Sequence, residues 1–218
     1  GSDQKPSAPT AWGSRRVLES RFGRACFCFI SQRAVEFCWK CFSHMVLSKQ
    51  AILDAIGGGD IKITPFSPAS VGPVSVDLRL GKKFRVFGKK KIRLLADENA
   101  FFGEDYRRNT KTRTVGKGGV LLGPGELVLG TTLERITLSQ NMSGKLEGRS
   151  RFARLGLMVH VSSSLVQPGV DNVQVLEILN VSPFELQLVP GAKICQIVFD
   201  RVEGKAKYEG TFRKQRAV

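Results

Sequence analysis

Short apolar stretches separated by turns that contain glycine or proline run from residue 64 to residue 199. The turns are Thr64-Pro65, Ser67-Pro68, Gly72-Pro73, Gly88, Gly118-Gly119, Gly123-Pro124-Gly125, Pro168-Gly169 and Pro190-Gly191. The strand-like segments among them are 74–80, 119–122, 126–129, 157–161, 173–179 and 192–199. Turn signals that recur about every 8–12 residues are typical of sandwiches and barrels. The pattern therefore predicts a mainly β fold, a barrel or jelly roll.

A short helix is predicted ahead of these strands. Ser48 is a suitable N-terminal cap, and Ile52, Leu53 and Ile56 recur at helical spacing behind it. The three glycines at 57–59 then end the helical pattern.

Composition limits the classes of function. The 218 residues suffice for one sizeable domain and an appendage. A net charge of +15 favours an anionic partner, such as a polyphosphate ligand, nucleic acid or a membrane surface. Nothing is expected to span a membrane, because no run of about eighteen apolar residues occurs. Four of the five cysteines precede residue 45, which argues against a disulfide framework and favours a reducing compartment.

Residues 1–44 differ in composition from the rest and are interpreted as an N-terminal extension. The segment begins with Gly1-Ser2, typical of an expression scar, and is rich in Arg but poor in acidic residues. A transit peptide and an extension without function both remain open. Cys26, Cys28, Cys38 and Cys41 are four potential zinc ligands, but the interleaved Phe residues favour packing. The domain is expected to span 45–218.

The densest basic cluster is Lys82-Lys83, Arg85, Lys89-Lys90-Lys91 and Arg93, interleaved with apolar residues. A nucleic-acid patch would have this composition. The solvated face of a half-buried strand pair would have it too, and this interpretation is preferred. Nucleic acid is therefore an unlikely partner on these grounds.

Polar and charged groups at 148–157 lie in a region otherwise typical of a β core. Ser150 and Arg154 are four residues apart, so a short helical turn places them on one face. Glu177 lies in an apolar run, where an ionised carboxylate needs a partner. A buried acid beside Arg and Ser suits a hydrolytic proton shuttle. A structural ion pair would give the same spacing, so both interpretations remain open.

Several motifs in one order resemble the dCTP deaminase branch of the dUTPase-like superfamily over about residues 45–210. They are 75–81, 122–126, 132–138, 148–157, 158–161, 168–169, 176–177, 190–196 and 207–208. The resemblance implies a distorted β jelly roll or barrel of the dUTPase-like type, with a short N-terminal helix, and a homotrimer with active sites at subunit interfaces. It implies deamination of dCTP to dUTP and ammonia. It also implies Mg²⁺ on the triphosphate, no direct protein ligand to a metal and no catalytic zinc.

The residues themselves agree that the reaction is not that of a zinc deaminase. Those enzymes need a His-x-Glu and a Pro-Cys-x-x-Cys signature. Neither His44 nor His160 is followed by such a Glu, and no Pro precedes Cys38.

The resemblance assigns three catalytic roles. Glu177 matches the general acid/base, Ser150 the serine that positions the attacking water, and Arg154 the arginine that holds both. A base beside the water and a cation beside the base suit an attack at C4 of cytosine.

The resemblance also implies a substrate-binding set: Arg149, Ser150, Arg151, Ser163, Gln167, Gln196, Lys207 and Tyr208. Arg149 and Ser150 open the phosphate clamp, where Arg151 replaces a small Ser. Ser163 replaces an Ala, and Gln167, Val170 and Asn172 replace the Asp, aromatic and Gly of the substrate hairpin. Gln196 matches a glutamine that contacts phosphate, and the segment at 207–208 folds over the nucleotide.

Other functions are weighed against this one. Plain dUTPases generally lack the Arg at 154 and use an Asp in a hairpin that contains Tyr; here Asp171 is not at the matching position. A bifunctional enzyme that yields dUMP and pyrophosphate, and a catalytically silent nucleotide- or nucleic-acid-binding homologue, remain alternatives. His160 is expected to be a satisfied core or interface residue, Asp77 and Arg79 an interface pair, and Cys195 an inert buried thiol. The expected location is cytoplasmic, or organellar if 1–44 holds a transit peptide.

Overall fold

The computed structural model describes residues 46–88, 92–94, 96–97, 100 and 103–216. The N-terminal extension with its four cysteines lies outside these residues, as do Lys89-Lys90-Lys91 of the basic cluster. The proposed division of the chain near residue 44 stays a prediction.

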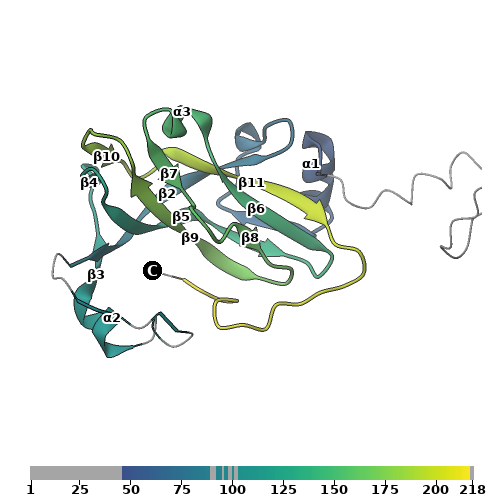
Figure 1. The fold of residues 1–218 in the computed structure, drawn as a ribbon. Coiled ribbons are helices and arrows are strands. Elements are labelled where there is room, and N and C mark those ends of the chain that lie inside the picture. The colour runs from purple at the N-terminus through teal and green to yellow at the C-terminus, as the bar shows by residue number, and fades with distance from the viewer. Residues whose placement is uncertain (1–45, 89–91, 95, 98–99, 101–102, 217–218) are drawn as a thin grey trace, which may run out of the picture. The chain divides into compact units, whose positions relative to one another are not determined.

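Most secondary-structure elements of the described chain are β-strands, and the helices are short (Figure 1). The helical elements are α1 (Lys49–Gly57), η2 (Pro68–Ser70), α2 (Glu104–Asn109) and α3 (Ser150–Ala153). The first strands are β1 (Ile61–Thr64), β2 (Val76–Phe87), β3 (Thr110–Thr114), β4 (Val120–Leu122), β5 (Leu127–Leu138) and β6 (Met142–Gly148). They are followed by β7 (Leu157–Val159), β8 (Leu165–Val166), β9 (Asp171–Asn180), β10 (Leu186–Leu188) and β11 (Lys193–Arg201).

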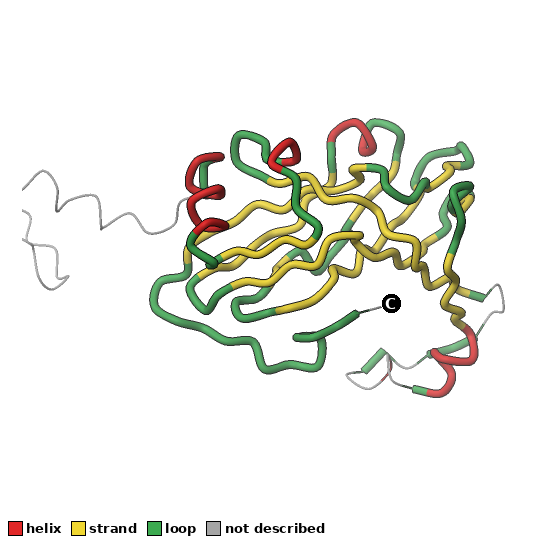
Figure 2. Tube along the Cα trace, turned by 180° about the vertical axis from the view of Figure 1, so that it is seen from behind, coloured by secondary structure: helices red, strands yellow, loops and turns green. Residues whose placement is uncertain are grey.

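Within the described part of the chain, nine strands form one sheet and two form a small second sheet. The large sheet runs β7-β9-β5-β2-β11-β6-β8, with β1 paired to β5 and β3 paired to β2. The pairs along this path are antiparallel, and strands far apart in sequence lie side by side, as β11 does between β2 and β6. The sheet curls on itself (Figure 2). The predicted mainly β fold of the barrel or jelly-roll type is confirmed.

The predicted helix is also confirmed as α1. The Ser48 hydroxyl accepts a hydrogen bond from the Ala51 N–H at 3.4 Å, and Gly58 caps the other end. Ile52 and Ala55 face the core. No helix among the described residues is long and apolar enough to cross a membrane.

Alternation along β9 positions the polar residues that matter below. Leu176 and Ile178 are fully buried in the core. Successive side chains of a strand point to opposite faces, so Glu177 between them points the other way and is half-buried. On β2 the alternation is interrupted where the pairing with β5 shifts register between Leu80 and Phe84: Lys82 and Lys83 are both exposed, and Phe84 is buried. Lys82 and Lys83 of the basic cluster are thus solvent-exposed on a strand, whereas Arg85 is half-buried and Arg93 lies outside the strands.

Candidate functional site

Glu177 on β9 is held by the loop that follows β7. The Ser162 backbone N–H donates a hydrogen bond to Glu177 Oε2 at 2.9 Å, and the Ser162 hydroxyl donates a second one at 3.0 Å. The other carboxylate oxygen, Oε1, makes no hydrogen bond with any residue that the structure describes. Two donors on one oxygen fix the orientation of the carboxylate group.

His160 begins this loop in a left-handed conformation, with φ of 64°. Its N–H donates to the Glu177 carbonyl at 2.7 Å, which continues the pairing of β7 with β9. Its ring Nε2 contacts the Ser163 carbonyl, so Nε2 carries the proton, because a carbonyl only accepts. The ring Nδ1 is buried and has no hydrogen-bond partner among the described residues. Within one protomer His160 is therefore not a fully satisfied core histidine, and the alternative of an interface histidine stays a prediction.

A cavity of about 420 Å³ opens in front of Glu177. A volume in this range suits a small organic ligand. Four predicted residues line it: Ser163, Gln167, Glu177 and Tyr208. Leu129, opposite Glu177 on β5, contributes an apolar wall.

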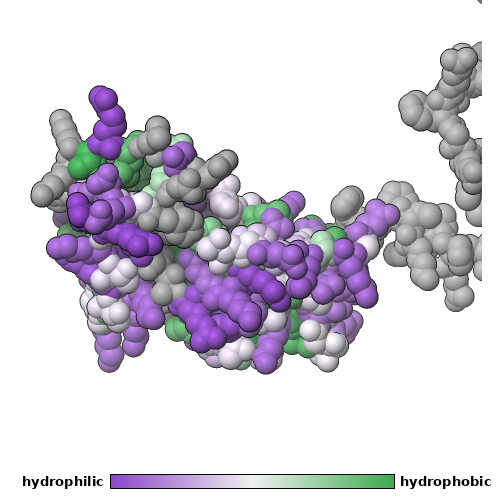
Figure 3. Space-filling view, turned by 90° about the horizontal axis from the view of Figure 1, so that it is seen from below, coloured by the Kyte–Doolittle hydropathy of each residue, from purple (hydrophilic) through white to green (hydrophobic). Residues whose placement is uncertain are grey.

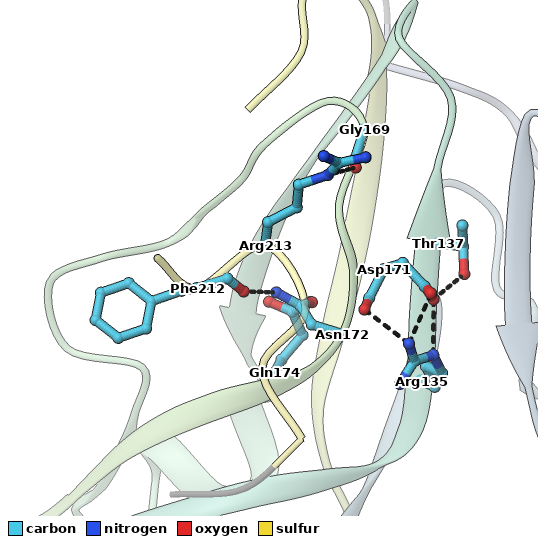
Figure 4. A network of polar contacts seen from close by, with 8 residues as sticks. All are labelled: Arg135, Thr137, Gly169, Asp171, Asn172, Gln174, Phe212 and Arg213. Carbon is cyan, nitrogen blue, oxygen red and sulfur yellow. Dashed lines mark hydrogen bonds and ion pairs between the residues drawn. The ribbon is translucent and has the colours of Figure 1, made fainter. Parts of the chain in front are cut away.

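The C-terminal segment 208–216 forms another wall of this cavity by lying along β9 (Figure 4). The Asp171 N–H donates to the Arg213 carbonyl at 3.0 Å, and the Val173 N–H donates to the Gln215 carbonyl at 3.1 Å. These two bonds extend the sheet by a short strand-like piece. Phe212 and Gln215 also line the cavity, so the segment closes over the pocket that contains Glu177.

Side-chain hydrogen bonds also hold the C-terminal segment against β9 and the turn before it. The Asn172 side-chain amide donates to the Phe212 carbonyl at 2.8 Å, and Gln174 donates to Asn172 Oδ1 at 2.6 Å. Arg213 donates from Nε to the Gly169 carbonyl at 3.3 Å. Asn172 and Gln174 are buried, so the bond between them forms out of contact with bulk water.

A second group of predicted residues gathers at the end of β6. Arg149 Nε lies 3.1 Å from Asp77 Oδ1, and Lys193 Nζ lies 3.4 Å from Asp77 Oδ2. Arg149 also donates from Nη1 to the Lys193 carbonyl at 2.9 Å. Arg79 pairs with Glu134 at 2.6 Å. Asp77 and Arg79 therefore do not pair with each other within the protomer, because each has its own partners, and their place at a subunit interface stays a prediction.

Gln196 belongs to this second group. It lies opposite Asp77 on β2 and opposite Glu147 on β6. Its Oε1 accepts a hydrogen bond from the Ser75 hydroxyl at 2.8 Å. Gln196 thus lies beside Arg149 and Lys193, where cationic side chains suit a phosphate group.

Ser150, Arg151 and Arg154 follow Arg149 on α3 and at its C-terminal end, and all three are exposed. The Arg154 side chain forms no hydrogen bond or ion pair with the residues that the structure describes, whereas its backbone N–H donates to the Ser150 carbonyl at 3.0 Å. Neither Ser150 nor Arg154 lines the cavity or bonds to Glu177 within the described chain. A single protomer thus carries the predicted residues in two groups, which we name the carboxylate pocket (Ser163, Gln167, Glu177, Tyr208) and the basic turn (Arg149, Ser150, Arg151, Arg154, Gln196).

Lys207, also predicted, points elsewhere. Its ammonium pairs with Glu209 at 3.1 Å in the C-terminal segment, and both side chains are well exposed.

Asp171 and Cys195 belong neither to the carboxylate pocket nor to the basic turn. Asp171 is bound to Arg135 and Thr137, so its carboxylate is not free to serve as a base. Cys195 is a buried free thiol, as expected, and burial raises its pKa to about 12; its inertness stays a prediction. Among the described residues, no three His, Cys, Asp or Glu side chains cluster in a way that holds a metal ion.

Comparisons with known proteins identify the family. The family model described as dCTP deaminase-like matches residues 46–202. A dCTP deaminase, dUMP-forming, from a Nocardioides species is 36% identical over 182 residues, which cover 79% of this chain and 92% of the relative. The dCTP deaminase of Halorubrum lacusprofundi is 34% identical over 165 residues, covering 75% of this chain and 80% of the relative.

A solved structure supports the fold. The crystal structure of 2'-deoxycytidine 5'-triphosphate deaminase from Agrobacterium tumefaciens matches with a TM-score of 0.56 at 22% identity. The match covers 74% of this chain and 49% of the other, so the protein spans about half the length of that chain. From the family match and the similarity of the curated relatives, the chain belongs to the dCTP deaminase-like family.

Proposed function

We propose that the protein hydrolytically deaminates dCTP, with Glu177 as the group that moves the protons. The observation that carries this proposal is the state of Glu177, which faces a cavity of ligand size with one oxygen held and the other unbonded within the described chain. A carboxylate placed in this way can take a proton from water and return it to a leaving group.

The reaction requires no redox step. Water adds to C4 of the cytosine ring, and Glu177 takes a proton from it and supplies one to the ring nitrogen N3. Collapse of this intermediate breaks the bond between C4 and the exocyclic nitrogen, which leaves as ammonia with the proton relayed through Glu177. The uracil nucleotide remains.

We propose that Ser150 and Arg154 reach Glu177 from a neighbouring subunit of a homotrimer. Both are exposed, and large apolar side chains beside them are exposed as well, with 54% of the Leu155 surface and 42% of the Met158 surface open. Apolar side chains next to an unpaired guanidinium are typical of a surface that another subunit covers. The carboxylate pocket of one subunit would then receive the basic turn of the next.

The basic turn, together with the neighbouring Lys193, is suited to the triphosphate. Arg149, Arg151 and Lys193 supply cationic donors, and Gln196 supplies an amide. These groups fit phosphate oxygens rather than a metal, so Mg²⁺ would enter with the triphosphate and neutralise part of its charge.

The names of the relatives favour dUMP and pyrophosphate as the final products, ahead of the dUTP that the sequence alone put first. Several curated relatives at 35–37% identity are called dCTP deaminase, dUMP-forming, whereas the Halorubrum relative is called dCTP deaminase. We therefore propose that this chain goes on to hydrolyse dUTP with a second water, giving dUMP and pyrophosphate.

The test is an incubation of the purified full chain with dCTP and Mg²⁺, with Glu177→Gln as the matched control. Chromatography separates the nucleotides, and ammonia and pyrophosphate are assayed separately. Ammonia with dUMP and equimolar pyrophosphate supports the full proposal, and ammonia with dUTP supports deamination alone. Bound but unchanged dCTP would identify a silent nucleotide-binding homologue. Binding that is indifferent to the base and falls steeply with salt would identify a nucleic-acid binder.

A further inference from the structure

Ser162 is the residue that makes the two oxygens of Glu177 different, and neither the motifs nor the comparisons assign it a role. Both of its donors, the backbone N–H and the hydroxyl, bind the same oxygen, Oε2, at 2.9 and 3.0 Å. We infer that Ser162 is a positioning residue that holds Oε2 and leaves Oε1 to exchange protons with water and substrate. This inference rests on the proposed function of Glu177.

A carboxylate needs such a restraint because its terminal torsion has a broad, roughly two-fold energy profile. Without donors on one side, either oxygen of Glu177 could face the cavity at many angles. Proton transfer requires heavy atoms within about 2.6–3.2 Å and a suitable angle. Two converging donors from one residue select a narrow range of orientations.

The loop is built to present these donors. His160 adopts the left-handed conformation, and its ring contacts the carbonyl of Ser163, so the ring spans the residue that holds Glu177. The His160 N–H is anchored on the Glu177 carbonyl. The loop therefore binds both the backbone and the side chain of the same residue, which couples its shape to the position of the carboxylate.

Ser162 acts differently from Ser150. Ser150 belongs to the basic turn and makes no bond to Glu177 within the described chain, whereas Ser162 bonds to it directly. Loss of the Ser162 hydroxyl removes one donor and leaves the backbone donor in place. We expect a carboxylate that is still bound but less well oriented.

The experiment compares Ser162→Ala and Ser162→Thr with Ser164→Ala in the full chain. Ser164 is the matched control, because its carbonyl accepts from the Leu146 N–H while its hydroxyl makes no hydrogen bond with the described residues. Steady-state ammonia release gives kcat and KM for dCTP. Misorientation of a catalytic group costs roughly tenfold to a hundredfold in rate, so kcat of Ser162→Ala should fall by about that factor. KM should stay within about threefold of wild type, since ground-state binding is retained.

Ser162→Thr keeps the hydroxyl and should recover most of kcat, while Ser164→Ala should match wild type. The inference is overturned if Ser162→Ala turns over like Ser164→Ala, if its KM rises with kcat unchanged, or if Thr fails to rescue. A destabilised fold would lower the activity of the Ala and Thr variants alike, so the rescue separates orientation from folding.

A second measurement is independent of turnover. The amide resonance of Ser162 should shift in Glu177→Gln, because a neutral amide replaces the charged acceptor, while the Ser164 amide should stay in place. If wild type releases no ammonia, the proposed function fails, and this resonance still reports whether Ser162 holds the carboxylate. An unchanged Ser162 resonance would refute the contact itself.

Discussion

The Arg135 guanidinium and the Asp171 carboxylate are joined across β5 and β9 by two short hydrogen bonds, from Nε to Oδ1 at 2.7 Å and from Nη2 to Oδ2 at 2.6 Å (Figure 4). Thr137 donates a third bond to Oδ1 at 2.7 Å. The Arg135 hydrogen bond, helped by that of Thr137, lowers the pKa of Asp171 to about 2. The pair secures the start of β9, directly beside the C-terminal segment.

Asp171→Asn should destabilise the protein at neutral pH and lose this effect in acid. The pKa of Asp171 is about 2 in the fold against an ordinary 3.8, so the pair stabilises fully above about pH 4. That contribution is lost as the pH falls through the folded pKa. Both side chains are partly exposed, at 29% and 41%, so solvent screening limits the effect to about 1 kcal/mol or less.

Urea unfolding of wild type and Asp171→Asn between pH 2 and pH 7 checks this prediction. Glu185→Gln is the control, because Glu185 is exposed and makes no bond with the described residues. A stability gap that is the same at both ends of the pH range would show that the ion pair is not its cause.

Removal of the residues after Tyr208 should expose two specific amides of β9. The N–H groups of Asp171 and Val173 donate to carbonyls of Arg213 and Gln215, which the truncation deletes. Their hydrogen exchange should accelerate. The Gln174 N–H donates to the Thr132 hydroxyl and should keep its protection.

Truncation should also raise KM for dCTP by roughly tenfold, because Phe212 and Gln215 no longer line the cavity. The segment lies at the lower side of the molecule in Figure 1. Figure 3 shows that face from below, and hydrophilic residues cover much of the face. Continued protection of both amides in the shortened chain would mean that the segment does not bind β9 in solution.

Much of the fold was predictable because it is encoded locally. The segment predicted at 173–179 lies within β9, and that at 192–199 overlaps β11 in all but its first residue. The order of the strands in the sheet was not predictable, because the periodicity of a sequence does not indicate which strands pair with each other. The length of β2 was also underestimated. The strand continues through Gly81 into the basic cluster and ends at Phe87, since strands on both sides pair with the segment that holds Lys82, Lys83 and Arg85.

The candidate site likewise has residues that the sequence predicts and residues that it does not. Glu177 was noticed because a carboxylate between Leu176 and Ile178 is unusual, and alternation places it on the open face. Ser162 was missed because it stands in a run of three serines that local sequence does not distinguish. The left-handed backbone of His160 was not predictable, because a positive φ in a residue other than Gly leaves no mark in the sequence.

Cys195 should resist alkylation in the native protein. Burial is the main cause that raises its pKa to about 12, so the thiolate fraction at pH 8 is on the order of 10⁻⁴. Peptide mapping after iodoacetamide treatment should find Cys195 unmodified in buffer and fully modified in urea. Rapid native labelling would show that this part of β11 opens to solvent.

Glu177→Gln should abolish ammonia release and retain dCTP binding. A neutral amide cannot take up and return a proton, and loss of a general acid/base typically costs about 10²–10⁴-fold in rate. Calorimetric titration with dCTP should give a dissociation constant within about threefold of wild type, since Gln keeps the size of the side chain. Turnover close to wild type would exclude Glu177 from the chemistry.

Mixing two inactive variants should restore activity if the carboxylate pocket and the basic turn meet between subunits. Arg154→Ala should inactivate the enzyme while the fold stays intact, because the Arg154 side chain is exposed and makes no hydrogen bond or ion pair in the described part of the protomer. Glu177→Gln inactivates the other half of each site.

When equal amounts of the two variants are unfolded and reassembled together, about a quarter of interfaces join an intact Glu177 to an intact Arg154 from two different chains. Ammonia release should therefore reach about a quarter of the wild-type rate, while each variant reassembled alone stays inactive. Trimers that form in the mixture, confirmed by light scattering, but release no ammonia would place Glu177 and Arg154 in sites that do not span two subunits.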